Sequence, residues 1–221
     1  MLNAYIVYEL SHPWGWIDCA DRDAASNAYS LVGFVEASVL DAAIALSLYA
    51  EARMQDPHRR PGDGAEPPYD FVRRLPVLFA ENFIHSLSHT RRGLNQIMGL
   101  GLSSDATITS ICAQFDAQFP GLVQIRDSIE HRDERVIGKA HQQTLTPSTD
   151  AIPGLAGEGV GLTIIVGLVG DMYNLTAADG SAPGIEISPG TLSPVIDLVQ
   201  QTFDALPWKK PQGSRTYSPS R

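Results

Sequence analysis

The clearest pattern of apolar and polar positions lies between residues 24 and 52. Apolar side chains recur there at steps of three and four residues, with no proline among them: Ala25, Tyr29, Val32, Val35, Val39, Ala42, Ala43, Leu46 and Tyr49. This period matches one face of an α-helix. The spacing therefore predicts a long helix over 24–52, capped at its start by Asp21, Asp23 or Ser26.

Similar patterns predict three further helices before residue 140. They cover residues 76–99 with Pro76 in the first turn, a segment from Ser103 or Ser104 through Phe115, and about 120–138. The polar stretch 55–68 is rich in proline and glycine, and it is typical of a surface loop between two helices.

The pattern changes after residue 140. Short β-prone runs at 162–168, 172–176 and 184–187 are separated by glycine-containing turns, which predicts an antiparallel meander. A closing amphipathic helix follows, with its start expected at Ser193-Pro194. An earlier start at Ser188-Pro189 is open, and it would leave Pro194 inside the helix.

The predicted fold is mainly α: a four-helix up-down bundle carrying a C-terminal three-stranded antiparallel meander plus helix. The expected division of the chain is an N-terminal arm (1–23), the helical bundle (24–140), a linker (141–160), the βββα appendage (161–207) and a disordered tail (208–221).

Composition narrows the class of protein. The apolar share of 43% and the charged share of 19% are typical of a globular chain. Cys19 and Cys112 lie far apart, which argues against a disulfide framework or a cysteine zinc site. With no long apolar run and no basic segment before an apolar block, we expect a cytoplasmic protein that does not contact a membrane. The net charge of −9 argues against sequence-independent binding of nucleic acid, so any RNA contact must rely on local arginines.

The segment Arg126-Asp127-Ser128-Ile129-Glu130-His131 combines two groups with complementary chemistry. An arginine fork can hold a phosphate bidentately, and a histidine can move a proton near neutral pH. Together they could cut a phosphodiester without a metal. The alternative is a solvated helix face on which Arg126 and Glu130 form a weak ion pair four residues apart.

This segment, with Arg126, the polar Asp127 and His131 late in a helical bundle, resembles the motif of the HEPN superfamily. Many members of that superfamily are metal-independent endoribonucleases. The resemblance covers roughly 24–140, and its specific motif is two or three residues long. It implies that Arg126 holds the phosphate, that His131 acts as acid or base at the ribose 2′-hydroxyl, and that Asp127 orients the histidine. It also implies a homodimer with both motifs in one cleft, an RNA substrate, a possible regulatory protein partner and no cofactor or metal.

A second group lies on the second predicted helix, where Glu81, His85 and His89 follow one another at steps of four and share a face. Two histidines one turn apart, with His131 as a third ligand, could hold a metal. They could equally form a polar seam between helices. Under the HEPN interpretation, His85, His89 and Arg92 would bind substrate beside Arg126.

The sequence therefore allows three functions: an endoribonuclease, a non-catalytic helical protein-interaction module, and a metal-binding helical bundle. No phosphate-binding loop of the Gly-x-x-x-x-Gly-Lys type and no Gly-x-Ser-x-Gly elbow is present in the sequence.

Overall fold

The structure is a computed structural model, and it describes residues 10, 16–54, 69–102, 105–132, 139–140, 143–144 and 166–209. The protein is mainly α-helical with a small antiparallel sheet, as the sequence predicts. The predicted loop 55–68, nearly all of the linker 141–160 and nearly all of the predicted tail lie outside the described residues.

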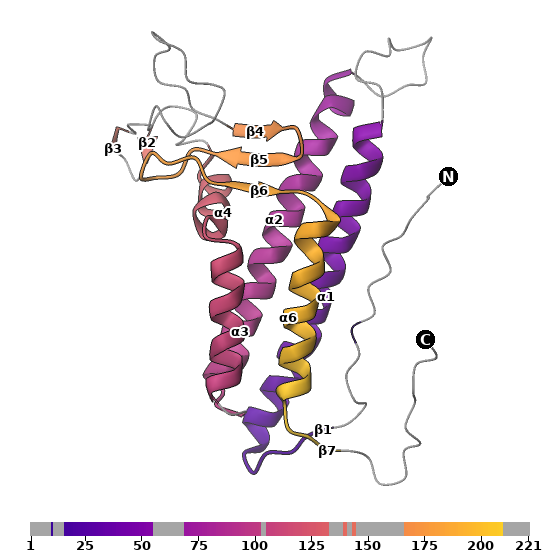
Figure 1. The fold of residues 1–221 in the computed structure, drawn as a ribbon, viewed down its shortest axis with the longest axis vertical. Coiled ribbons are helices and arrows are strands. Elements are labelled where there is room, and N and C mark those ends of the chain that lie inside the picture. The colour runs from indigo at the N-terminus through magenta and orange to yellow at the C-terminus, as the bar shows by residue number, and fades with distance from the viewer. Residues whose placement is uncertain are drawn as a thin grey trace.

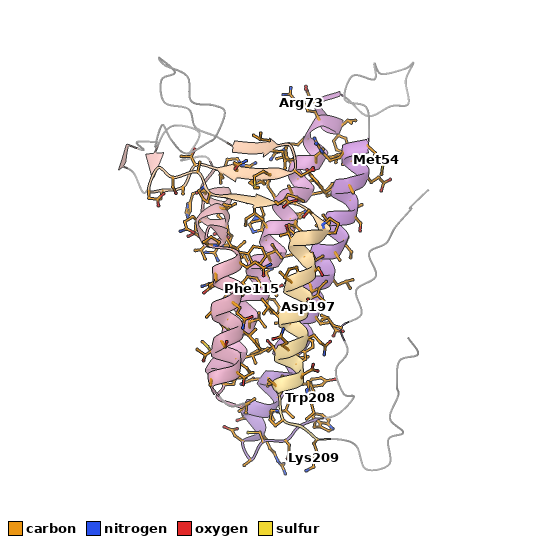
Figure 2. The ribbon with its side chains drawn as sticks, viewed as in Figure 1. Met54, Arg73, Phe115, Asp197, Trp208 and Lys209 are labelled. Carbon is orange, nitrogen blue, oxygen red and sulfur yellow. The ribbon has the colours of Figure 1, made fainter. Side chains whose placement is uncertain are left out.

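Helices α1 (Arg22–Met54) and α2 (Tyr69–Gly99) pack against each other along their length and run in opposite directions, with Met54 and Arg73 at the same end of the molecule (Figures 1 and 2). Asp21 is the residue that caps α1, because its carboxylate accepts hydrogen bonds from the backbone N–H groups of Asp23 and Ala24 at 2.9 and 3.1 Å. The predicted first helix is thus confirmed.

The start predicted for the second helix at Pro76 is wrong. The helix begins at Tyr69, and Pro76 lies inside it. A proline in a helix removes one N–H donor and crowds the carbonyl four residues earlier. The half-buried side chains of Val77 and Phe79 pack this part of α2 against the core, and that packing offsets the loss.

Two shorter helices follow, α3 (Asp105–Gln118) and α4 (Leu122–Glu130). Helix α4 ends at Glu130 with His131 as its C-cap, and does not run unbroken toward residue 138 as expected. Residues 133–138 lie outside the described part of the chain. In Figure 1, α4 sits next to the sheet, at the end of α3.

The predicted meander is confirmed as a three-stranded antiparallel sheet in the order β4 (Val166–Val169), β5 (Met172–Leu175) and β6 (Gly184–Glu186). Gly170, with a φ of 62°, makes the tight turn between the first two strands. The sequence did not predict two small ladders, which pair β1 (Trp16–Ile17) with β7 (Trp208–Lys209) and β2 (Lys139–Ala140) with β3 (Gln143–Thr144).

The closing helix α6 (Pro189–Ala205) begins at the earlier of its two possible starts, so the preferred start at Ser193-Pro194 is wrong. The Ser188 hydroxyl accepts a hydrogen bond of 3.2 Å from the backbone N–H of Thr191 and caps the helix. Pro194 lies inside α6. Burial of Leu192 and Val195, on either side of this proline, offsets its missing hydrogen bond.

One hydrophobic core joins these elements. Helix α6 packs on α1 and α3, and its buried side chains belong to the same cluster as those of the other helices and of strands β5 and β6. The sheet lies over one end of α3, α4 and α6, beside the upper parts of α1 and α2, which extend past it (Figure 1). The candidate site lies at this end, where α2, α4 and β5 meet.

By length and composition alone, α1 is apolar enough to cross a membrane, and 44% of its most apolar window is buried within the protein. A buried core helix has the same properties.

Candidate functional site

Arg126 lies on α4, and two carboxylates hold its guanidinium group. The Nε atom donates a hydrogen bond of 3.0 Å to Oδ1 of Asp127, and Nη2 contacts the same oxygen. The Nε atom also lies 3.7 Å from Oε1 of Glu130, four residues later. The Arg126 side chain remains 32% exposed, so an anion from solvent can reach it.

His131 lies directly after α4, where the backbone leaves the helix (φ −108°, ψ 36°). Its backbone N–H donates a hydrogen bond of 3.0 Å to the carbonyl oxygen of Asp127, and its side chain is exposed. The carboxylate of Asp127 is engaged with Arg126. Residues 127 and 131 are therefore joined through the backbone, while the carboxylate positions the arginine.

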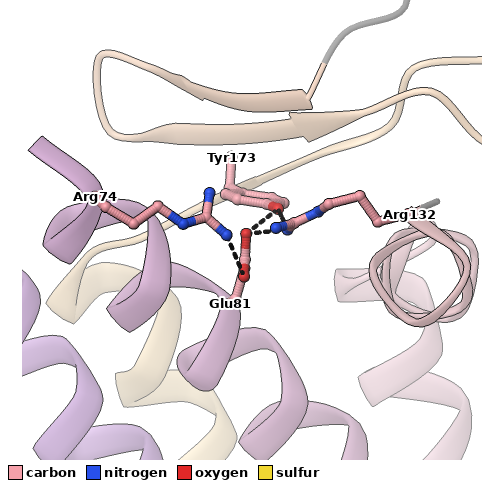
Figure 3. A network of polar contacts seen from close by, with 4 residues as sticks. All are labelled: Arg74, Glu81, Arg132 and Tyr173. Atoms are coloured by element: carbon pink, nitrogen blue, oxygen red, sulfur yellow. Dashed lines mark hydrogen bonds and ion pairs between the residues drawn. The ribbon is translucent and has the colours of Figure 1, made fainter. Parts of the chain in front are cut away.

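The residue after the histidine, Arg132, reaches across to α2. Figure 3 shows its guanidinium group in contact with Oε1 of Glu81, and Nη2 also donates a hydrogen bond of 3.2 Å to the Tyr173 hydroxyl. Tyr173, on β5, donates a hydrogen bond of 2.9 Å to the same Glu81 oxygen. Arg74 lies 3.5 Å from the other carboxylate oxygen. This Glu81 network connects α2, the end of α4 and the sheet.

The Glu81 carboxylate and the Tyr173 hydroxyl at the centre of this network are shielded from water. Glu81 is 7% exposed and Tyr173 is fully buried. Burial, reinforced by the negative charge of Glu81, raises the pKa of the Tyr173 hydroxyl. Burial alone would lower the pKa of Arg132, but the paired carboxylate more than offsets this and raises it. Two buried polar atoms on this side of α4, Oγ of Ser128 and Nε of Arg132, have no hydrogen-bond partner among the described residues.

His85 faces α4 from one turn further along α2. Its side chain is half-buried, and burial lowers the pKa of its imidazole. The nearby carboxylates of Glu130 and Glu81 act in the opposite direction, whereas His89 and Arg126 lower the pKa further. The structure thus brings His85 within electrostatic range of Arg126, and burial favours the neutral form of its imidazole.

The other two residues predicted to bind substrate, His89 and Arg92, are exposed on α2. The ring of His89 lies 6.0 Å from that of Phe34 on α1. Within the described ranges, no three His, Cys, Asp or Glu side chains are grouped so as to hold a metal ion. The metal-binding interpretation of His85, His89 and His131 gains no support.

Sequence reasoning missed Arg132 and Tyr173 as parts of this region. A partial indication was present in the sequence. Glu81 lies on the same face of its helix as His85, and a buried carboxylate requires a cation. Nothing in the sequence specified which of the chain's arginines would supply it.

No family model, curated protein or solved structure matches this chain. The interpretation of the site therefore rests on its own residues and their contacts.

Proposed function

We propose that this chain is a HEPN-like, metal-independent endoribonuclease that acts in the cytoplasm and cuts RNA by attack of a ribose 2′-hydroxyl on the adjacent phosphate. The observation that carries the proposal is the end of α4, where Arg126 is partly exposed and the helix terminates at an exposed His131. An anion-binding group and a proton-transfer group thus occupy one accessible segment.

In the proposed reaction, His131 takes the proton of the 2′-hydroxyl while that oxygen bonds to phosphorus. The bond from phosphorus to the 5′-oxygen breaks, a cyclic phosphate forms, and the leaving oxygen takes up a proton from solvent water. Arg126 would stabilise the negative charge that builds on the phosphoryl oxygens. His85, His89 and Arg92 would line the path of the RNA on α2.

The existing partners of Arg126 bear on how a phosphate would bind. The Asp127 contact holds the guanidinium close to the helix, whereas Glu130 is more distant, at 3.7 Å, and 51% exposed. Exchange of Glu130 for a phosphate oxygen would keep the Asp127 contact and replace a weak, solvent-screened pair. We also propose a homodimer that brings two motifs to one cleft, with a regulatory protein able to cover it.

The test is cleavage of a labelled single-stranded RNA by the purified full chain in the presence of EDTA. Arg126→Ala and His131→Ala should each abolish cleavage while the circular dichroism spectrum is kept. Arg22→Ala is the control, because this exposed arginine lies at the start of α1, at the opposite end of the molecule from the sheet and α4 (Figure 1). Wild-type protein without activity, or variants as active as the control, would refute the proposal.

A second candidate function, a non-catalytic protein-interaction module, is favoured by the exposed apolar residues of α1. The exposed fractions are 40% for Phe34, 57% for Leu40 and 48% for Ile44. Leu40 and Ile44 lie one helical turn apart and share a face, and contiguous exposed apolar side chains mark interaction surfaces. Light scattering after size-exclusion chromatography would test for self-association, with Leu40→Lys expected to weaken it. A monomeric, inactive wild-type chain would leave binding to a different protein as the remaining form of this candidate.

A further inference from the structure

His131 is fixed by the residues on both sides of it. On one side its backbone N–H is bonded to the carbonyl of Asp127, in the last turn of α4. On the other side, the side chain of Arg132 is anchored on Glu81 and Tyr173 (Figure 3). A residue between two fixed neighbours has little freedom in its backbone, so the direction of the His131 side chain depends on both anchors.

The Glu81 anchor is strong because its carboxylate is withdrawn from water. The Glu81 side chain is 9% exposed and that of Arg132 is 27% exposed. A buried carboxylate without a cation is very unfavourable, so the pair has no easy alternative. Arg74 is a weaker substitute, since it is 51% exposed and lies 3.5 Å away. Tyr173 completes the anchor by bonding to both members of the pair.

We infer that Glu81 is a positioning residue for His131 and acts through Arg132. The inference rests on the proposed function only for its effect on catalysis. Loss of the Glu81 charge releases Arg132 and the backbone that precedes it. The imidazole is then in position to take the proton of the 2′-hydroxyl for a smaller share of the time, while the phosphate contact of Arg126 is kept.

The variant Glu81→Gln keeps the shape of the side chain and removes its charge. A misplacement of about 1 Å can reduce a rate by about 10²-fold, so kcat for RNA cleavage should fall by about that factor while KM changes by less than about twofold. Arg132→Gln should have the same effect, and the double variant should be no slower than either single one, because both changes act through one contact.

Asp171→Asn is the matched control. Asp171 also accepts a hydrogen bond from a buried tyrosine, Tyr49, and also pairs with an arginine, Arg53, but both of these partners lie on α1. This variant also changes a carboxylate to an amide, and it should leave kcat and KM unchanged.

A direct measurement makes the inference independent of activity. Imidazole NMR signals of the full chain should show the His131 resonance shifted or broadened in Glu81→Gln and unchanged in Asp171→Asn. Arg132→Lys, which keeps the cation, should move the signal less than Arg132→Gln and provides the test if Glu81→Gln fails to fold. An unmoved His131 signal in folded Glu81→Gln, or an equal change in the control, would overturn the inference. An inactive wild type with a shifted His131 signal would refute the nuclease alone.

Discussion

The hydroxyl group of Tyr173 donates a hydrogen bond of 2.9 Å to Oε1 of Glu81, although the two residues lie 92 positions apart in the chain. Tyr173 belongs to the central strand of the sheet, and Glu81 to the middle of α2. Both side chains are buried, and Arg132 contacts both. The contact therefore joins the sheet to the helices at the point where the candidate site is built.

Tyr173→Phe should lower the free energy of unfolding by about 1–3 kcal/mol, because the buried Glu81 loses a donor that water cannot easily replace. Urea denaturation followed by circular dichroism measures the change. Tyr49→Phe is the matched control: Tyr49 is also buried and donates a hydrogen bond of 2.8 Å, but its acceptor, Asp171, has a side chain that is 59% exposed. This control should cost about 1 kcal/mol or less. Equal losses in the two variants would contradict the role given to burial of Glu81.

Arg132→Met should cost about 3 kcal/mol, since it leaves the Glu81 carboxylate buried with only Arg74 as a distant cation. Arg91→Met removes another arginine that pairs across helices, in this case with Asp116 at 3.0 Å between Nη2 and Oδ2. The side chains of this pair are 32% and 47% exposed, so its loss should cost about 1 kcal/mol or less. Urea denaturation gives the change in the free energy of unfolding for both variants, from the shift in midpoint at an unchanged dependence on urea concentration. A midpoint shift for Arg91→Met as large as that for Arg132→Met would argue against a special role for the buried pair.

The sequence predicts the helices well because apolar side chains at helical spacing identify the face of each helix that is buried. The stripe from Val32 to Tyr49 is found in the core, and the β-prone runs are found as strands. Pro76 and Pro194 misled the prediction of helix starts. Proline is usual in the first turn of a helix, but both helices begin before their proline and contain it, because tertiary packing stabilises the earlier turns.

The candidate site was less predictable. The helical spacing of Glu81 and His85 identifies the α2 stripe, and the structure places His85 beside Arg126 and Glu130. The hydrogen-bond partners of Glu81 come from positions 51 and 92 residues away. Such contacts depend on how the sheet docks onto the helices, and no local pattern encodes that arrangement.

The lowered pKa of His85 predicts a pH-dependent stability. Below pH 6.5, the ordinary pKa of histidine, the unfolded chain binds a proton that the half-buried imidazole of the native state takes up only at lower pH. The unfolded state then holds more protons, so stability should fall as the pH is lowered from 7 through 6.5 to the folded-state pKa.

Urea denaturation at a series of pH values would show this dependence in the wild type, with a flatter curve for His85→Asn. His89→Asn removes one of the groups that lower the pKa of His85, so its curve should lie between those of the wild type and His85→Asn. An unchanged slope in His85→Asn would mean that other groups cause the dependence.

Two glycines inside helices should respond in opposite directions to alanine. A Cβ atom at Gly93 would overlap Cγ2 of Val35 and lie 3.1 Å from Cδ1 of Phe34, so Gly93→Ala should force α1 and α2 apart and cost about 1–3 kcal/mol. A Cβ atom at Gly33 would meet nothing within 4 Å, so Gly33→Ala should stabilise the protein by about 0.5–1 kcal/mol through helix propensity. Thermal unfolding would separate the two, with a lower midpoint for the first variant and a higher one for the second. A higher midpoint for Gly93→Ala would mean that the helices do not approach as closely as the structure places them.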